Sequence, residues 1–352
     1  MGLIRLEIKN IRNLHSVSIE PGPGLNGLYG LNGSGKTSLL EALYILGRGS
    51  SFRSKDLGRV LQDGAQQFLI TGKLSPQNIS IGVEYQAQGL RFRVDGQTVQ
   101  SRMELAGQLP LLFISPESHA LVSEGPRQRR RFLDWGVFHV ELGFMPAWRR
   151  YQRALKQRNR ALGMPGVETA WDNELARAAE EITQLRRDYL ERLTPFVDRY
   201  VRRLVDLDPV TLGFASGWRQ GHDFMEALQD SLAQDREYGF TRQGPHRADV
   251  IIKVGSRPAR ETISRGQQKL LVIALLLSQV ALMNEAALPG PVILVDDLAA
   301  ELDIHHRQRL LTVLSELQAQ VFLTVTERQA LPANDEIAFR WFHVEQGEIM
   351  PG

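Results

Sequence analysis

Residues 30–37 read Gly-Leu-Asn-Gly-Ser-Gly-Lys-Thr and fit the pattern G-x-x-x-x-G-K-[ST]. A short apolar stretch, 25–29, precedes them, and apolar residues with helical spacing follow over 37–46. A glycine loop between a strand and a helix is the context in which this pattern forms a phosphate-binding loop, or P-loop. A chance glycine-rich turn is the alternative, but it would explain neither flanking element. The pattern therefore predicts an α/β fold with a phosphate site at the start of a helix.

In such a loop the backbone N–H groups and the helix N-terminus face the phosphates. Lys36 is expected to reach the β- and γ-phosphates, and the Thr37 hydroxyl to bind Mg²⁺. The residues expected to bind ATP are Gly30, Asn32, Gly33, Ser34, Gly35, Lys36, Thr37 and Ser38.

A second motif is the apolar stretch 292–295 followed by two aspartates, a Walker B pattern. Asp296 at the end of a buried strand is expected to hold an Mg²⁺-bound water. Asp297 is the candidate that orients or activates the attacking water, and together with Lys36 it forms the expected catalytic pair. Alone, the two aspartates could equally be a polar pair that ends a core strand, but a P-loop in the same chain favours the catalytic interpretation.

Ser264, Arg265, Gly266 and Gln267 stand before an apolar helix predicted over 263–284. A serine hydroxyl, a glycine amide and a helix N-terminus form an anion site. The same residues fit an ordinary capping box, with Ser264 at the cap and Gln267 three positions on. Their place before a Walker B motif favours the anion site.

The remaining pattern predicts one discontinuous α/β domain with a helical insertion. Alternating apolar residues over 3–9 and 79–94 predict antiparallel strands, while the apolar stretches 292–295 and 321–325 are typical of a buried parallel sheet. Residues 170–205 predict one long helix, or two that meet near Pro195. We expect an ATPase head over 1–120, a helical arm domain over 121–240, and the rest of the head over 241–352.

Composition limits the possible functions. The 352 residues contain no cysteine and carry a net charge of +2, so thiolate metal sites are excluded and any nucleic-acid surface must be local. The longest apolar run, 270–277, is too short for a membrane span and predicts a buried segment.

The order of motifs resembles the ABC-type ATPase heads of the SMC and Rad50 class. Four further segments make the chain similar to the RecF family of bacterial recombination mediators. These segments are 10–14 (Asn-Ile-Arg-Asn-Leu), 115–117 with 125–134, 244–247 (Gly-Pro-His-Arg) and 296–303 (Asp-Asp-Leu-Ala-Ala-Glu-Leu-Asp). The resemblance covers the whole chain. It departs from general ABC heads at Asp297, where a Glu is usual, and in having Thr324 and Thr326 where transporters carry a switch histidine.

The resemblance implies an ATP-dependent homodimer in which the 264–267 segment of one subunit closes on the nucleotide of the other. It also implies a D-loop with Glu301 and Asp303, a switch residue at Thr326, and slow ATP hydrolysis that acts as a switch. The implied partners are double-stranded DNA, single-strand/duplex junctions, RecR, RecO and, indirectly, RecA. The resemblance also implies that the protein acts in the cytoplasm in association with the nucleoid, and that it does not bind a membrane.

Arg127, Arg129, Arg130 and Arg131 begin an arginine-rich stretch that reaches residue 160, and they are candidate DNA contacts. The alternative is a solvated helix face with some arginines paired to glutamates in residues 174–191.

Two other functions remain possible on the sequence. A transporter ATPase would place the P-loop much closer to the S-x-G-Q segment, and a small-molecule P-loop kinase would not need that segment.

Overall fold

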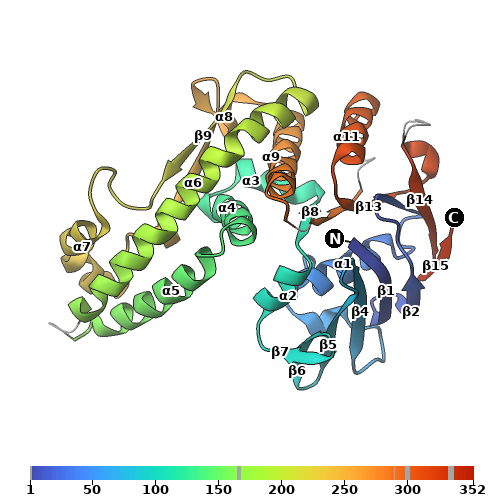
Figure 1. Cartoon of the computed structure of the whole chain (residues 1–352), viewed down its shortest axis with the longest axis horizontal. Coiled ribbons are helices and arrows are strands. Elements are labelled where there is room, and N and C mark those ends of the chain that lie inside the picture. The colour runs from blue at the N-terminus through green and yellow to red at the C-terminus, as the bar shows by residue number, and fades with distance from the viewer. Residues whose placement is uncertain (1, 165–167, 289, 298–301, 332–336) are drawn as a thin grey trace. The chain divides into compact units, whose positions relative to one another are not determined.

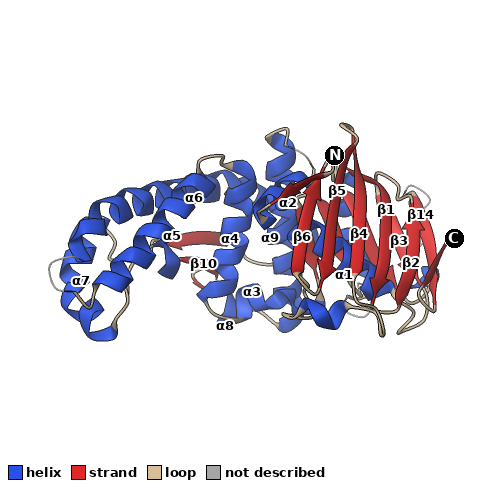
Figure 2. Ribbon diagram, turned by 90° about the horizontal axis from the view of Figure 1, so that it is seen from below, coloured by secondary structure: helices blue, strands red, loops and turns tan. Residues whose placement is uncertain are grey.

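The computed structural model describes residues 2–164, 168–288, 290–297, 302–331 and 337–352. The chain forms two compact units, which are drawn in Figures 1 and 2. One unit, here called the head unit, contains residues 1–118 and 283–352, and the other, the arm unit, contains residues 119–282.

The head unit contains two six-stranded sheets. The first is antiparallel, and Figure 2 labels β1, β2, β4, β5 and β6 among its strands. In spatial order it consists of β2 (Leu14–Ile19), β1 (Gly2–Ile11), β4 (Phe68–Ser75), β5 (Ile79–Gln86), β6 (Gly89–Val94) and β7 (Gln97–Val99). Between β6 and β7 the turn residues Asp95 and Gly96 have positive φ angles of 47° and 77°, as a tight hairpin requires.

The second sheet carries the motifs. Its spatial order is β15 (Glu348–Pro351), β14 (Phe339–Glu345), β3 (Leu25–Tyr29), β13 (Gln320–Val325), β12 (Val292–Val295) and β8 (Leu111–Ile114). All neighbours are parallel except β15, which pairs antiparallel with β14. The predicted combination of a parallel P-loop sheet with an antiparallel portion is confirmed.

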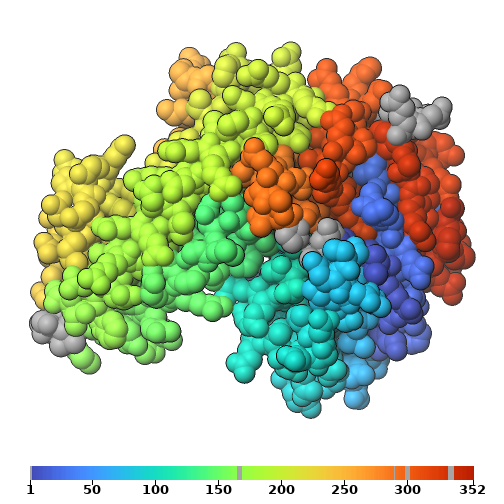
Figure 3. All heavy atoms as spheres, viewed as in Figure 1, coloured from blue at the N-terminus to red at the C-terminus, as the bar shows by residue number. Residues whose placement is uncertain are grey.

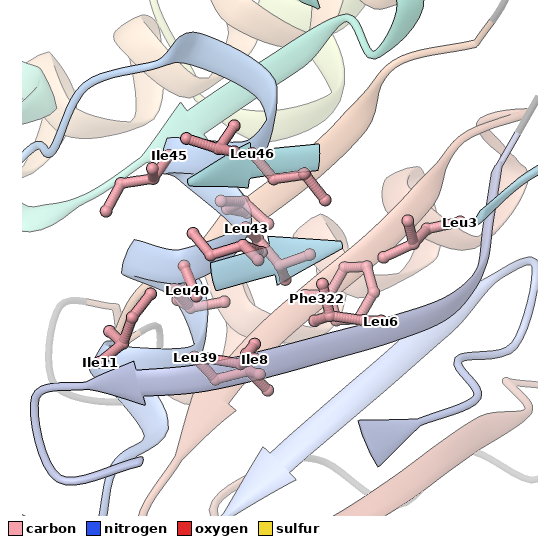
Figure 4. Packing of buried hydrophobic residues seen from close by; sticks show 14 of the residues in the cluster. Leu3, Leu6, Ile8, Ile11, Leu39, Leu40, Leu43, Ile45, Leu46 and Phe322 are labelled. Atoms are coloured by element: carbon pink, nitrogen blue, oxygen red, sulfur yellow. The ribbon is translucent and has the colours of Figure 1, made fainter. Parts of the chain in front are cut away.

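Helix α1 (Lys36–Arg48) packs in a core that draws on both sheets. Figure 4 shows Leu39 and Leu43 of this helix near Ile8 of β1 and Phe322 of β13. A helix that is apolar on most sides must be buried on most sides, and each fully buried leucine contributes about 1.5–3 kcal/mol. This burial holds the start of α1 at one position beneath the P-loop.

The other described helical elements of the head unit are α11 (Ile304–Glu316), which is as long as α1, and four shorter ones. The shorter ones are η1 (Leu57–Val60), α2 (Arg102–Gln108), η2 (Pro116–His119) and η5 (Arg328–Ala330).

The arm unit is mainly helical and contains one small antiparallel sheet. Its described helices are α3 (Ala120–Ser123), α4 (Pro126–Val140), α5 (Phe144–Ala161), η3 (Glu168–Trp171), α6 (Asp172–Leu204), α7 (Phe224–Tyr238), η4 (Pro245–Arg247), α8 (Ala259–Thr262) and α9 (Arg265–Glu285), of which the last three residues belong to the head unit. Its strands are β9 (Val210–Ala215), β10 (Asp249–Val254) and β11 (Arg257–Pro258). The sequence left open one or two helices near Pro195, and α6 is one continuous helix.

Helix α9 is long and apolar enough to cross a membrane, but 78% of its most apolar window is buried inside the protein. It is therefore a core helix, as expected from the run at 270–277.

The compact units divide the chain at 282/283 rather than at the expected boundary of 240/241. Residues 241–282 belong to the arm unit, because β10 pairs along its whole length with β9. Arg129 of α4 also forms an ion pair with Asp249 at the start of β10, with a 2.7 Å contact. The other expected boundary, at 120/121, lies two residues from the observed division at 118/119. Residues 264–267 therefore lie outside the compact unit that contains the P-loop.

A buried ionic network joins three helices of the arm unit. The Arg158 guanidinium is fully buried and donates to Asp172 at 2.8 Å and to Asp235 at 2.7 Å. The Thr241 hydroxyl also lies 2.7 Å from the guanidinium. Removing one partner of a buried ion pair leaves a charge without compensation.

Asp235→Ala is predicted to destabilise the arm unit by about 3–5 kcal/mol. Four of the five tryptophans, at 135, 148, 171 and 218, lie in this unit, so their fluorescence during urea unfolding measures the loss. The control is Asp198→Ala, which removes a looser contact of 3.9 Å with the exposed Arg202 and should cost about 1 kcal/mol or less. Equal losses in the two variants would contradict the prediction.

Candidate functional site

The P-loop connects β3 to α1 through backbone that only glycine adopts easily. Gly30 and Gly35 have φ angles of +154° and +122°. A Cβ added at Gly30 would lie 2.1 Å from the carbonyl oxygen of Val344, so a side chain is excluded there by space as well as by conformation. The loop is thereby fitted closely against β14.

Lys36 occupies the centre of this loop. Its ammonium donates to the carbonyl oxygens of Gly30 at 2.6 Å and Leu31 at 2.9 Å. Burial lowers the pKa of Lys36, and the nearby Asp297 and Asp296 carboxylates oppose that shift. A phosphate would offer the ammonium stronger, charged acceptors than these two carbonyls.

Two features of the loop fit an anion. The buried Ser34 hydroxyl has no hydrogen-bond partner among the described residues. Among the described residues, no side chain caps the first turn of α1, whose N-cap is Gly35. Uncapped amides at the start of a 13-residue helix carry positive potential, so ATP phosphates fit this loop.

Sequence reasoning missed Asn13, which braces the loop from the β1–β2 turn. Its side-chain amide donates to the carbonyl oxygen of Ser34 at 3.0 Å, and it accepts from the Ser38 hydroxyl at 2.8 Å. The backbone N–H of Gly347 donates to the same Ser34 oxygen at 2.8 Å. The Ser38 side chain, expected to bind ATP, therefore holds the loop in place. Asn13 lies in the family-like segment 10–14, which was the available signal.

Asp296 follows β12 and meets the P-loop helix. The Thr37 hydroxyl donates to its Oδ1 at 3.3 Å, which confirms that the two expected Mg²⁺ residues come together. Burial raises the pKa of Asp296, while hydrogen bonds from Thr324 and Thr37 oppose that shift. A hydroxyl and a carboxylate are hard oxygen ligands, and Mg²⁺ commonly takes one or two such groups together with phosphates and water. These residues fit Mg²⁺.

Thr324 is a second site residue; the sequence analysis placed it with Thr326 at the switch position but gave the switch role to Thr326 alone. Its hydroxyl donates to Asp296 Oδ1 at 2.9 Å and accepts from the backbone N–H of Asp297 at 2.8 Å. It is almost fully buried at the end of β13. Asp297 itself has a left-handed φ of +50°. The Thr324 hydroxyl thus holds the Asp296 carboxylate and the Asp297 backbone. Its signal in the sequence was the one hydroxyl in the otherwise apolar stretch 321–325. Thr326, the expected switch residue, is exposed, and its carbonyl oxygen accepts from Gly30 N–H.

The 264–267 segment forms the capping box that the sequence offered as an alternative. Ser264 N–H donates to Gln267 Oε1 at 3.0 Å, and Gln267 N–H donates to the Ser264 hydroxyl at 3.3 Å. Ser264, Arg265 and Gly266 are exposed, so the cap leaves them accessible to another molecule.

Of the expected D-loop residues, Glu301 lies outside the described residues. Asp303 caps α11 by accepting from the backbone N–H groups of His305 and His306 at 3.0 Å. Hydrogen bonds from His306 lower the pKa of Asp303 to about 2.

The four candidate DNA arginines of α4 separate into two pairs. Arg129 binds both carboxylate oxygens of Asp249, at 2.7 and 2.9 Å, and Arg130 donates to the carbonyl oxygen of Ala248 at 2.7 Å. These two side chains hold α4 to the start of β10. Arg127 and Arg131 are exposed and lie one helical turn apart, whereas Arg129 and Arg130 are half-buried.

Comparisons with known proteins show the family to which the chain belongs. Residues 2–350 match the family described as the RecF/RecN/SMC N terminal domain. The DNA replication and repair protein RecF of Pseudomonas putida strain GB-1 is 43% identical over 359 residues, which cover 99% of this chain and 98% of that protein.

Solved structures of RecF and of an Smc head are similar to this chain in fold. A structure titled as the recombination mediator protein RecF with ATP in the RecFOR pathway superimposes with a TM-score of 0.87 and 25% identity, over 99% of this chain and 97% of that one. An Smc head bound to the C-terminal winged-helix domain of ScpA has a TM-score of 0.63 and 14% identity, over 99% and 96% of the two chains, and so supports the fold alone.

Thr324→Val is predicted to lower ATP hydrolysis roughly ten- to hundredfold. The substitution keeps the shape of the side chain but removes two hydrogen bonds, one to the Asp296 carboxylate and one from the backbone N–H of Asp297. Thr324→Ser keeps the hydroxyl and should retain most of the activity. Steady-state phosphate release, measured for both variants, tests this. Thr324→Val with unchanged turnover would show that the aspartates are held by other contacts.

Proposed function

Because the chain belongs to the RecF family, we propose that it is an ATP-dependent DNA-binding protein of recombinational repair and replication-fork maintenance. In this proposal ATP binding produces a homodimer that holds double-stranded DNA and single-strand/duplex junctions. With RecO and RecR, the dimer promotes loading of RecA at gaps. It acts in the cytoplasm, with the nucleoid. The observation that carries the proposal is the meeting of Lys36, Thr37, Asp296 and Asp297 in a chain that matches RecF over its full length.

Each residue of the site has a proposed task in binding Mg-ATP. The P-loop amides and Lys36 hold the phosphates, while Thr37 and Asp296 hold Mg²⁺, the latter through a water. Bound Mg²⁺ would neutralise phosphate charge. Asp297 accepts a hydrogen bond from the attacking water and orients it. Because Asp is one methylene shorter than Glu, hydrolysis is proposed to be slow and to act as a switch.

The exposed 264–267 segment is proposed to serve the nucleotide of a second subunit. Its serine and glycine lie at the start of the 21-residue helix α9, where backbone amides attract an anion. The exposure of Ser264 and Gly266 supports this proposal. Asp303, at the start of α11, is proposed to contact the partner as part of the D-loop, and Thr326 to sense the γ-phosphate.

A small-molecule kinase and a transporter ATPase were the alternatives. Neither accounts for a relative that is 43% identical over nearly the entire chain and is named for DNA replication and repair. We therefore retain the RecF function as the single proposal.

Ser264→Arg is predicted to abolish ATP-dependent dimerisation while each monomer still binds ATP. The long side chain would fill the space proposed for the partner's γ-phosphate. Sedimentation velocity with and without ATP measures dimerisation, and equilibrium titration with labelled ATP in dilute protein measures binding. Ser264→Ala is the control, because it removes the cap hydroxyl, at a cost of about 1 kcal/mol, without adding bulk. Loss of ATP binding by the dilute Ser264→Arg monomer would place the segment in its own subunit's site.

Asp297→Asn is predicted to keep ATP binding, to slow hydrolysis by roughly 10²–10⁴ and to prolong the DNA-bound dimer. Asparagine tolerates the left-handed φ of +50° as well as aspartate does, so the backbone should be preserved. Single-turnover hydrolysis and the dissociation rate from duplex DNA test the two effects. A single-turnover rate equal to that of the unsubstituted protein would mean that another group activates the water.

A further inference from the structure

Helix α5 carries six basic residues and no acidic residue. Two of the six are used inside the arm unit. Arg158 is fully buried against Asp172 and Asp235, and Arg150 forms ion pairs with Glu174 and Glu181 of α6. The other four are exposed, and we call them the α5 cationic stripe: Arg149, Arg153, Lys156 and Arg160.

The four stripe residues share one face of the helix. Their spacings of four, three and four residues place them within a narrow band along the helix axis. The opposite face is buried and includes Ala147, Tyr151, Ala154 and Arg158. Figure 1 shows α5 at the border of the arm unit beside α6, and atoms of α5, in green, lie at the surface in Figure 3. The stripe therefore points away from the packed interior of its unit.

No acidic side chain of α5 offsets the positive charge of the stripe. Within the ranges that the structure describes, none of the four side chains forms an ion pair with an acidic residue. Like charges three and four positions apart on a helix repel one another and destabilise it. The arrangement thus lowers the stability of α5, which favours a role in binding over a role in folding.

We propose that the α5 cationic stripe binds the phosphate backbone of double-stranded DNA. From Arg149 to Arg160 the helix rises about 16.5 Å, at about 1.5 Å per residue. That length spans roughly five base-pair steps of about 3.4 Å along the duplex axis. The four cations can therefore contact several backbone phosphates without the helix having to read bases.

The side chains beside the stripe favour a duplex over a single strand. Single-strand binders stack bases on exposed aromatic rings, but between 149 and 160 the one aromatic residue, Tyr151, is buried. An open depression along the stripe is lined by Gln152, Arg153, Leu155, Lys156, Asn159 and Arg160. Its two amide side chains can donate hydrogen bonds to phosphate oxygens. The contact is thus sequence-independent.

This inference rests on the proposed function, since it names the surface that the DNA of that function contacts. It narrows the sequence-based hypothesis, which took Arg127–Arg131 and the arginine-rich stretch to residue 160 as the basic element and named only residues of α4 as candidate contacts, to four exposed cations of α5.

The test is a quadruple variant, R149Q/R153Q/K156Q/R160Q. Glutamine is a good helix former, so α5 should persist. The matched control, R177Q/R187Q/R199Q/R202Q, also removes four positive charges, but from exposed positions of α6. Both variants must retain the circular dichroism and ATP binding of the unsubstituted protein. Affinity for a random-sequence duplex is measured with ATP at several salt concentrations.

We expect the stripe variant to bind the duplex at least roughly tenfold more weakly at low salt. The slope of log affinity against log salt should flatten by up to about 3.6 per subunit, at about 0.9 for each phosphate that the variant no longer neutralises. The control should keep nearly the full slope. Equal losses of affinity in the stripe and control variants would overturn the inference, because net charge alone would then explain them.

Two further outcomes separate this inference from the proposed function. An unchanged slope in the stripe variant, with a flattened slope in R127Q/R131Q, would overturn the inference and leave the function standing. The stripe would then be a solvated face or a surface for an acidic protein. If the unsubstituted protein bound no duplex with ATP, the proposed function would fail as well.

Discussion

The backbone between β3 and α1 is the constraint on which the candidate site depends. Gly30 and Gly35 adopt positive φ angles, and the carbonyl oxygen of Val344 leaves no room for a side chain at Gly30. The loop keeps this conformation because α1 is buried in a core that draws on both sheets, and because Asn13 and Gly347 hold the Ser34 carbonyl oxygen. These contacts fix the loop backbone around the Lys36 ammonium, which is where the ATP phosphates are proposed to bind.

The chemistry around this loop follows from the parallel sheet. Strands β3, β13 and β12 are neighbours and point the same way, so their carboxyl ends meet at one edge. At that edge Thr37 and Thr324 both donate to Asp296, and Thr324 also accepts from the Asp297 backbone. Segments that lie far apart in the chain thereby form one cluster. Desolvation raises the pKa of Asp296, so the two hydroxyls help to keep its carboxylate charged.

The arginines of the arm unit perform two different physical tasks. Arg129 and Arg158 bind aspartates inside the unit, and the buried Arg186 donates to Asp134 at 2.9 Å and to the Pro245 carbonyl oxygen at 2.8 Å. Such residues determine how helices and strands pack. The arginines and lysine on the outer face of α5 contact no acid among the described residues, and their charge is available to a polyanion. A net charge of +2 for the whole chain conceals this division.

The sequence by itself determined the P-loop, the Walker B strand and the helical structure over 170–205, because each depends on local spacing and local backbone preference. It left open whether that helix is interrupted at Pro195. It also predicted that Thr37 and Asp296 would meet, since P-loop sheets bring those strand ends together. Only the tertiary structure decided that residues 241–282 pack with the arm unit, that Asn13 and Thr324 belong to the site, and that Arg129 is internal while Arg127 is exposed. Those outcomes depend on which distant segments come into contact, and an arginine carries the same charge in the sequence whether or not an aspartate 120 positions away binds it.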